Sequence, residues 1–191
     1  MELHPTYAGR LWVSQTWIRW ILSLISSPLY SILLNGAPSP AFYPSRGIRK
    51  EDPLSPFLFV LMAEGLGKIF KSHIQDHSLR GLSLHHRPPI SHQQFIDDNM
   101  LFFHPSVQEA STLKSILDYF SLVAGPSVNN SKSQIFFFNT PLITQCNIAR
   151  ILGFPIVVLP SKYLGLPLID SVLKHSSWKE LLDKLESRLS L

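Results

Sequence analysis

Two adjacent carboxylates, Asp97 and Asp98, are the residues of this 191-residue chain whose types and spacing are best suited to chemistry. They lie between apolar runs in the segment FIDDNMLFF, residues 95–103, a pattern typical of a hairpin. Asp and Asn favour turns because their side chains bond to the local backbone, so a purely structural turn is one interpretation. Two carboxylates on a rigid tip also offer oxygen ligands to a hard cation such as Mg²⁺, so a metal site is the other.

The rest of the sequence predicts an α+β domain to position this tip. Periodicity and capping signals predict helices over residues 16–24, 55–74, 106–125 and 177–189 and strands over residues 31–34, 93–96, 100–103, 134–138 and 162–168. Ser55 is the expected N-cap of the second helix, with Pro56 at its first position. Ser106 and Glu109 predict a capping box for the third helix, and Gly125 predicts its left-handed end.

Composition narrows the class of protein. Hydrophobic residues make up 45% of the chain and charged residues 16%, which excludes an intrinsically disordered protein. The single cysteine, Cys146, excludes a disulfide framework and favours a reducing compartment. The net charge of +4 is compatible with a polyanionic partner. The apolar residues 20–34 are too short for a membrane span and are interrupted by Pro28, so we predict no membrane partner and an intracellular location, in nucleus or cytoplasm.

Five segments of the chain resemble known sequence boxes. Residues 95–98 (FIDD) resemble F/Y-A-D-D, and residues 46–59 (RGIRKEDPLSPFLF) resemble R-G-I/L-R-Q-G-D-P-L-S-P-x-L-F. Residues 31–36 (SILLNG) resemble the strand before that box. Residues 125–133 (GPSVNNSKS) resemble G-x-x-I/L-N-x-x-K-S, and residues 163–168 (YLGLPL) resemble Y-L-G-L/I/V-P-L. Such an ordered set is more specific than a lone aspartate pair, and it resembles, in order, the boxes of reverse transcriptases of non-LTR (LINE-type) retrotransposons, in their plant version.

The resemblance implies a partial palm and fingers domain over residues 1–170, with an antiparallel sheet packed on helices, and the beginning of a thumb helix over residues 171–191. It implies two-metal nucleotidyl transfer with Mg²⁺ or Mn²⁺, and an RNA template, a DNA primer and deoxynucleotides as partners. No obligate protein partner can be inferred from the sequence. Asp97 and Asp98 would be the catalytic metal ligands, and Lys132 would stabilise or protonate the pyrophosphate leaving group.

Two further sets of residues are implied by the same resemblance. The nucleotide- and template-binding set is Arg46, Gly47, Arg49, Lys50, Asp52, Pro53 and Ser55, and the primer-side set is Tyr163, Leu164 and Gly165. A solvated surface lysine stays open as the alternative for Lys132. A turn packed on the core stays open as the alternative for residues 163–168.

Three departures from the family pattern bear on activity. The family's earlier metal-binding box, F-x-x-x-Y/F/V-D, has no counterpart, and Glu2 is the sole acidic residue ahead of Arg46. The usual Gln-Gly pair is replaced by Lys50 and Glu51, although glycine permits close approach of a ligand to the backbone. The small residue before the aspartate pair is replaced by Ile96. We therefore expect weak metal affinity and little or no turnover.

Two functional hypotheses follow. The first is an RNA-directed DNA polymerase domain fragment that is inactive as an isolated chain. By comparison with the family, the fingers strands and the first palm box are expected before residue 1, and the rest of the thumb after residue 191. The second is a non-catalytic retroelement remnant with at most weak nucleic-acid binding.

Overall fold

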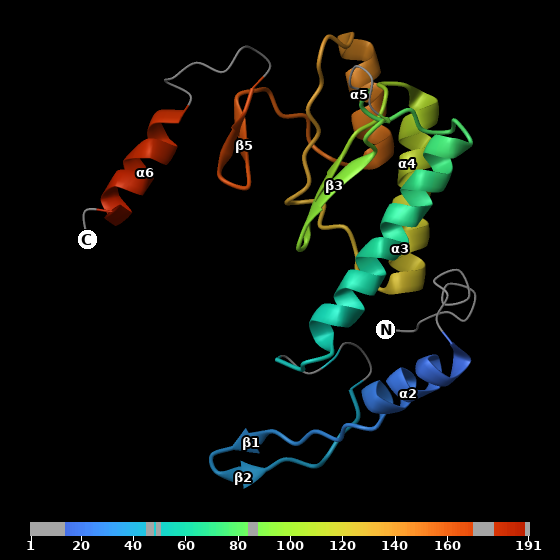
Figure 1. Ribbon diagram of the computed structural model, residues 1–191, viewed down its shortest axis with the longest axis vertical. Helices are drawn as coiled ribbons and strands as arrows, with labels where there is room; N and C mark the ends of the chain where they lie inside the picture. Colours follow the sequence, from blue (N-terminus) through green and yellow to red (C-terminus); the bar gives the residue numbers. More distant parts are fainter. Residues whose placement is uncertain (1–13, 45–47, 49–50, 84–87, 170–177, 190–191) are drawn as a thin grey trace. The chain divides into compact units, whose positions relative to one another are not determined.

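The structure, a computed structural model, describes residues 14–44, 48, 51–83, 88–169 and 178–189 (Figure 1). The helices are α2 (Gln15–Ser26), α3 (Ser55–Gln75), α4 (Val107–Ala124), α5 (Leu142–Leu152) and α6 (Lys179–Leu189). The antiparallel strand pairs are β1 (Leu33–Leu34) with β2 (Ala37–Pro38), β3 (His92–Phe95) with β4 (Asp98–Leu101), and β5 (Ser161–Tyr163) with β6 (Leu166–Leu168). The expected mixture of helices and antiparallel strands is confirmed, but over the described residues the three hairpins do not join into one sheet.

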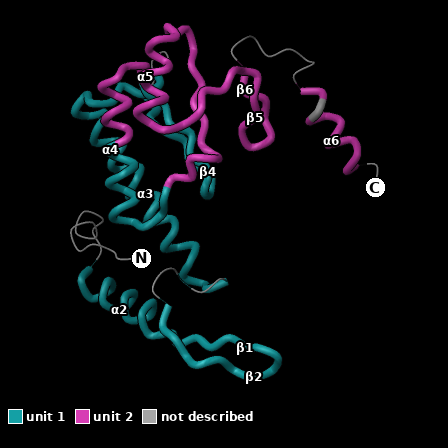
Figure 2. Tube along the Cα trace, turned by 180° about the vertical axis from the view of Figure 1, so that it is seen from behind, with its two compact units in different colours: residues 1–103, 115–127 teal, residues 104–114, 128–191 magenta. Residues whose placement is uncertain are grey.

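The chain divides into two compact units, coloured separately in Figure 2. The first comprises residues 1–103 and 115–127, and the second comprises residues 104–114 and 128–191. Helix α4 contributes residues to both units. The predicted domain boundary between residues 170 and 171 lies outside the described part of the chain.

Helix α3 supports the β3–β4 hairpin in the first unit, and its buried residues include Leu58, Leu66 and Phe70. The predicted N-cap is wrong by one residue, because Leu54 occupies the cap position without a side-chain cap bond. Asp52 Oδ1 instead accepts a hydrogen bond from the Leu54 backbone N–H at 2.9 Å. This bond is a local Asx-type turn, so the carboxylate rather than the Ser55 hydroxyl fixes the chain leading into α3.

The start of α4 confirms half of the predicted capping box. The backbone N–H of Glu109 donates to Ser106 Oγ at 3.2 Å. The Glu109 carboxylate, however, accepts from the backbone N–H of His104 at 2.9 Å, upstream of the cap. Gly125 has a φ of 89°, as expected for the left-handed residue after a helix.

Three elements in the second unit differ from the sequence-based prediction. Residues 134–138 are not a strand, because Ile135 forms only an isolated parallel bridge with Ile156. Helix α5 was not predicted, although Gly153 ends it in the left-handed conformation that glycine favours. Residues 162–168 are not one extended piece but fold into the β5–β6 hairpin. Short apolar runs do not distinguish a strand from a buried loop, which explains the first error.

No helix among the described residues is both long and apolar enough to cross a membrane.

Candidate functional site

The two aspartates lie at the tip of the β3–β4 hairpin. Phe95 pairs with Asp98, so the connecting turn consists of Ile96 and Asp97 alone. Asp98 is therefore the first residue of β4, whereas the sequence-based prediction places it in the turn between the strands. Both carboxylate-bearing residues are exposed. The predicted hairpin is confirmed, with its strands beginning and ending one or two residues earlier than expected.

The turn of this hairpin has an unusual backbone. Ile96 has a φ of 51°, in the left-handed region, whereas Asp97 does not. A positive φ at the first of two turn residues is the pattern of a type II′ turn, which favours glycine there. For a β-branched residue this conformation is a genuine outlier that costs roughly 1–2 kcal/mol. The acidic tip is thus locally strained, and its surroundings must maintain it.

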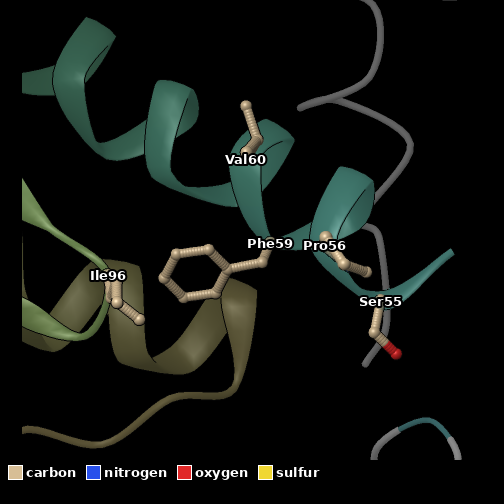
Figure 3. A pocket seen from close by; sticks show the side chains of 5 residues that line it. All are labelled: Ser55, Pro56, Phe59, Val60 and Ile96. Carbon is tan, nitrogen blue, oxygen red and sulfur yellow. The ribbon is translucent and has the colours of Figure 1, made fainter. Parts of the chain in front are cut away.

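The surroundings of the tip are the first turns of α3. An open, mainly apolar pocket is lined by Ser55, Pro56, Phe59, Val60 and Ile96. The Phe59 ring points toward Ile96, as Figure 3 shows. The structure therefore brings Ile96 of the tip, rather than Asp97 or Asp98 itself, to the same pocket as Ser55, a member of the predicted nucleotide- and template-binding set.

The other members of that set are only partly described. Arg46, Gly47, Arg49 and Lys50 lie outside the described residues. Asp52 is half-buried and holds the turn before α3, as described above, whereas Pro53 is exposed. The Asp-Pro-Leu-Ser-Pro run therefore has a clear structural role in starting the helix, whatever its ligand.

Two of the three departures from the family pattern coincide with left-handed backbone. Glu51 replaces a glycine and has a φ of 67°, and Ile96 replaces a small residue and has a φ of 51°. Glycine adopts such a φ without steric cost, whereas other L-residues are strained there by roughly 1–2 kcal/mol. The sequence reveals both substitutions, but only the backbone conformation reveals their energetic cost.

Lys132 lies in a turn of the second unit that Asn129 organises. Asn129 Oδ1 accepts hydrogen bonds from the backbone N–H of Ser131 at 3.1 Å and from its Oγ at 2.7 Å. The Asn129 carbonyl oxygen accepts from the Lys132 backbone N–H at 3.1 Å. The Lys132 residue itself is exposed, which fits both a leaving-group role and a solvated surface lysine.

The primer-side set also belongs to the second unit, at the β5–β6 hairpin. Tyr163 ends β5 and is half-buried. Leu164 and Gly165 form the turn, with φ values of 52° and 79°. Both turn residues are exposed, so the alternative of a turn packed on the core does not describe them.

The fit of a metal ion to the tip rests on Asp97 and Asp98. Carboxylate oxygens are suitable ligands for Mg²⁺ or Mn²⁺, and water can complete the coordination of a hard cation. In the parts of the chain that the structure describes, no three His, Cys, Asp or Glu side chains come together as a metal-binding group. Among the described residues, Asp97 and Asp98 are therefore the carboxylates that a metal site at the tip would use.

His92, at the beginning of β3, is a residue whose role the sequence did not reveal. Its ring stacks on Phe70 of α3, with ring centroids 5.1 Å apart. Its Nδ1 lies 2.8 Å from Ser91 Oγ, within hydrogen-bonding distance. Desolvation lowers the pKa of His92, and the negative charge of Glu64 partly opposes that shift. Gly67, one of two glycines within α3, is a local signal that another group approaches the helix closely.

Comparison with known proteins provides one relative of undefined activity. No protein-family model matches the chain. Over 67 residues the chain is 40% identical to an uncharacterized mitochondrial protein of Arabidopsis thaliana. The matched stretch covers 35% of this chain and 55% of that protein, so the chain spans about half the length of its relative. This chain is thus similar to a plant mitochondrial protein over about a third of its length.

Proposed function

We propose that the chain is a fragment of an RNA-directed DNA polymerase of the non-LTR retrotransposon type, with the β3–β4 hairpin as its metal-binding element. Asp97 and Asp98 would hold Mg²⁺ or Mn²⁺, which when bound activates a primer hydroxyl and stabilises the leaving phosphate oxygen. Lys132 would place a positive charge near the pyrophosphate. An RNA template, a DNA primer and deoxynucleotides would be the partners.

The observation that supports this proposal is the exposed aspartate tip beside the first turns of α3. Ile96 of the tip and Ser55 of the helix line the same pocket, although they are far apart in the sequence. The resemblance treats the segments that contain these two residues as parts of one site.

The expected activity of the isolated chain is low. Two carboxylates without a third acidic ligand would hold a cation only weakly. The strained Glu51 adds a negative charge in the segment that the resemblance places near an anionic triphosphate. We therefore expect metal binding at the tip and little or no primer extension.

A Mn²⁺ titration followed by NMR tests the metal site. Paramagnetic broadening should begin at the Asp97 and Asp98 amide signals and should be lost in Asp97→Asn. Asp183→Asn, at an exposed position of α6, is the matched control and should leave the titration unchanged. Broadening that persists at the tip in Asp97→Asn would contradict the proposal.

The second candidate, a non-catalytic remnant that binds nucleic acid weakly, is favoured by the strain at Glu51 and Ile96. Neither residue suits the conformation that it adopts, as expected where selection for activity has relaxed. A primer-extension assay with Mg²⁺ or Mn²⁺ separates the candidates. Incorporation that Asp97→Asn abolishes supports an active polymerase, whereas salt-sensitive RNA binding without metal binding at the tip supports the remnant. RNA binding that is absent or insensitive to salt removes the binding role.

A further inference from the structure

We propose that His92 is the positioning residue of the hairpin, because its ring fills a notch at Gly67 of α3 and thereby holds the Asp97–Asp98 tip at the beginning of that helix. This inference rests on the proposed function of the tip. Its structural part concerns only the first unit and is testable without any catalytic assay.

The alternation of side chains along β3 sets the face that meets α3. Successive residues of a strand point to opposite faces, so His92 and Gln94 share one side. Within β3, His92 and Gln94 are partly buried, while Gln93 and Phe95 are exposed. Asp98, as the cross-strand partner of Phe95, lies on the outward face. The hairpin thus rests on α3 through one face and presents Asp98 on the other.

One contact holds that face at the base of β3, where His92 stacks on Phe70. At the other end, Ile96 of the turn is 68% exposed and lines the open pocket with Phe59. Residues 59 and 70 of a helix are separated by about 16 Å at 1.5 Å per residue. Residues 92 and 95, the ends of β3, are separated by about 10 Å at 3.3 Å per residue. β3 therefore runs antiparallel to α3, from Phe70 toward the pocket at Phe59, so the base contact determines where the tip lies.

Gly67 makes the base contact possible. A Cβ atom added there would lie 3.2 Å from Nε2 and 3.5 Å from Cε1 of His92. The shorter distance is tighter than an ordinary van der Waals contact, so the ring would have to shift. Glycine is otherwise unfavourable inside a helix, which gives this position a packing reason for keeping it.

Among the described residues, the charged group that acts on the ring is Glu64 of α3. Glu64 also forms an ion pair with Lys68, with 3.9 Å between Nζ and Oε1. Ser91 supplies the polar neighbour from the hairpin itself. Because burial disfavours the protonated ring, the contact of His92 with α3 is expected to weaken as the pH falls below about 6.5.

A double-mutant cycle on the full chain tests the notch. We would measure hydrogen exchange of the β3–β4 amides in the wild type, Gly67→Ala, His92→Ala and the double variant. With His92 present, Gly67→Ala should not raise the hydrogen-exchange protection of β3–β4, because the tight contact with the ring cancels the gain from the higher helix propensity of alanine. With His92→Ala, the same Gly67→Ala change should raise protection about fivefold. An equal effect of Gly67→Ala on protection with and without the His92 ring would overturn the proposed contact at Gly67.

A conservative variant tests positioning as distinct from stability. His92→Phe keeps an aromatic ring on Phe70, so Mn²⁺ broadening at Asp97 and Asp98 should be retained and should no longer vary between pH 7.5 and 5.5. His92→Ala should weaken the Mn²⁺ broadening at Asp97 and Asp98 severalfold. Wild-type broadening in His92→Ala would overturn the positioning role. If even the wild type binds no Mn²⁺, the proposed function fails, and the exchange cycle alone decides whether His92 holds the tip.

Discussion

The three hairpins of this chain have turns of the same length but of different chemistry. The β1–β2 turn is Asn35-Gly36, with φ values of 51° and 84°, and the β5–β6 turn is Leu164-Gly165, with 52° and 79°. Both are type I′ turns with glycine second, the usual solution for a tight hairpin. The β3–β4 turn, Ile96-Asp97, has no glycine and a positive φ at Ile96 alone.

This difference shows which hairpins are formed locally and which one needs tertiary support. Leu33 and Leu34 of the first hairpin are 72% and 64% exposed, so turn chemistry rather than burial maintains it. The acidic hairpin has an unfavourable turn but rests on α3 through the stack of His92 on Phe70. Strain of this kind persists only where the surrounding structure imposes it, and it is concentrated at functional sites.

The largest effect should come from removing the support under the acidic hairpin. Phe70 is 1% exposed and carries the His92 stack. Phe70→Ala should lower the free energy of unfolding of the first unit by about 3–5 kcal/mol, and β3–β4 should lose its hydrogen-exchange protection. Phe57→Ala, at a 69% exposed position of the same helix, should change it by less than about 0.5 kcal/mol. Equal losses in the two variants would show that burial on α3 does not support the hairpin.

The glycine turns should respond to a single methyl group. An added Cβ at Gly36 or Gly165 would meet no atom within 4 Å, so its cost is purely conformational. Gly36→Ala and Gly165→Ala should each destabilise their hairpin by about 1–2 kcal/mol in local hydrogen exchange. Asp97→Ala, at the corresponding turn position of β3–β4, should cost less because Asp97 does not have a positive φ. A cost at Asp97 as large as at the glycines would remove the distinction between the turns.

Glycine should have the opposite effect in the acidic turn. Ile96→Gly relieves the left-handed strain but adds flexibility to the unfolded chain, so β3–β4 should gain about 0.5–1 kcal/mol in local stability. Phe95→Gly, one residue earlier in the strand, should lose a similar amount because extended backbone gains nothing from glycine. A loss of stability in Ile96→Gly would mean that the contact with Phe59 outweighs the strain.

The smallest effect is a pH dependence that only the supported hairpin should show. Because the folded-state pKa of His92 lies below its unfolded value of about 6.5, the unfolded chain takes up a proton first as the pH falls. The His92 contribution is therefore complete above pH 6.5 and is lost as the pH falls through the folded-state pKa.

Denaturation of the wild type and His92→Phe between pH 7.5 and 5 measures this loss. His92→Phe should not show this loss of stability at low pH. Identical dependence of stability on pH in the wild type and the variant would contradict the prediction. The pKa of Asp76 is lowered by its hydrogen bonds to Ser78, so its own contribution falls in a separate, more acidic window below about pH 4.

Local signals predicted several helices and hairpins well. The Ser106 half of the α4 cap and the Asn35-Gly36 turn depend on a few neighbouring residues and agree with the prediction. Helix α3 also begins beside Pro56 as expected, although its N-cap is Leu54 rather than Ser55. Helix α5 was missed although Gly153 marks its end and Ile148 and Leu152 form its buried face. The supposed strand over residues 134–138 failed because pairing depends on a distant partner, and Ile135 finds only Ile156.

The sequence by itself determined the candidate chemistry, since Asp97 and Asp98 are adjacent in any fold and residues that flank them favour a hairpin. Only the tertiary structure decided where that tip lies, which of its residues is strained and what supports it. The reason is physical: a turn is encoded by neighbours in the chain, whereas the seating of His92 on Phe70 beside Gly67 joins residues that are far apart in sequence and leaves no local pattern.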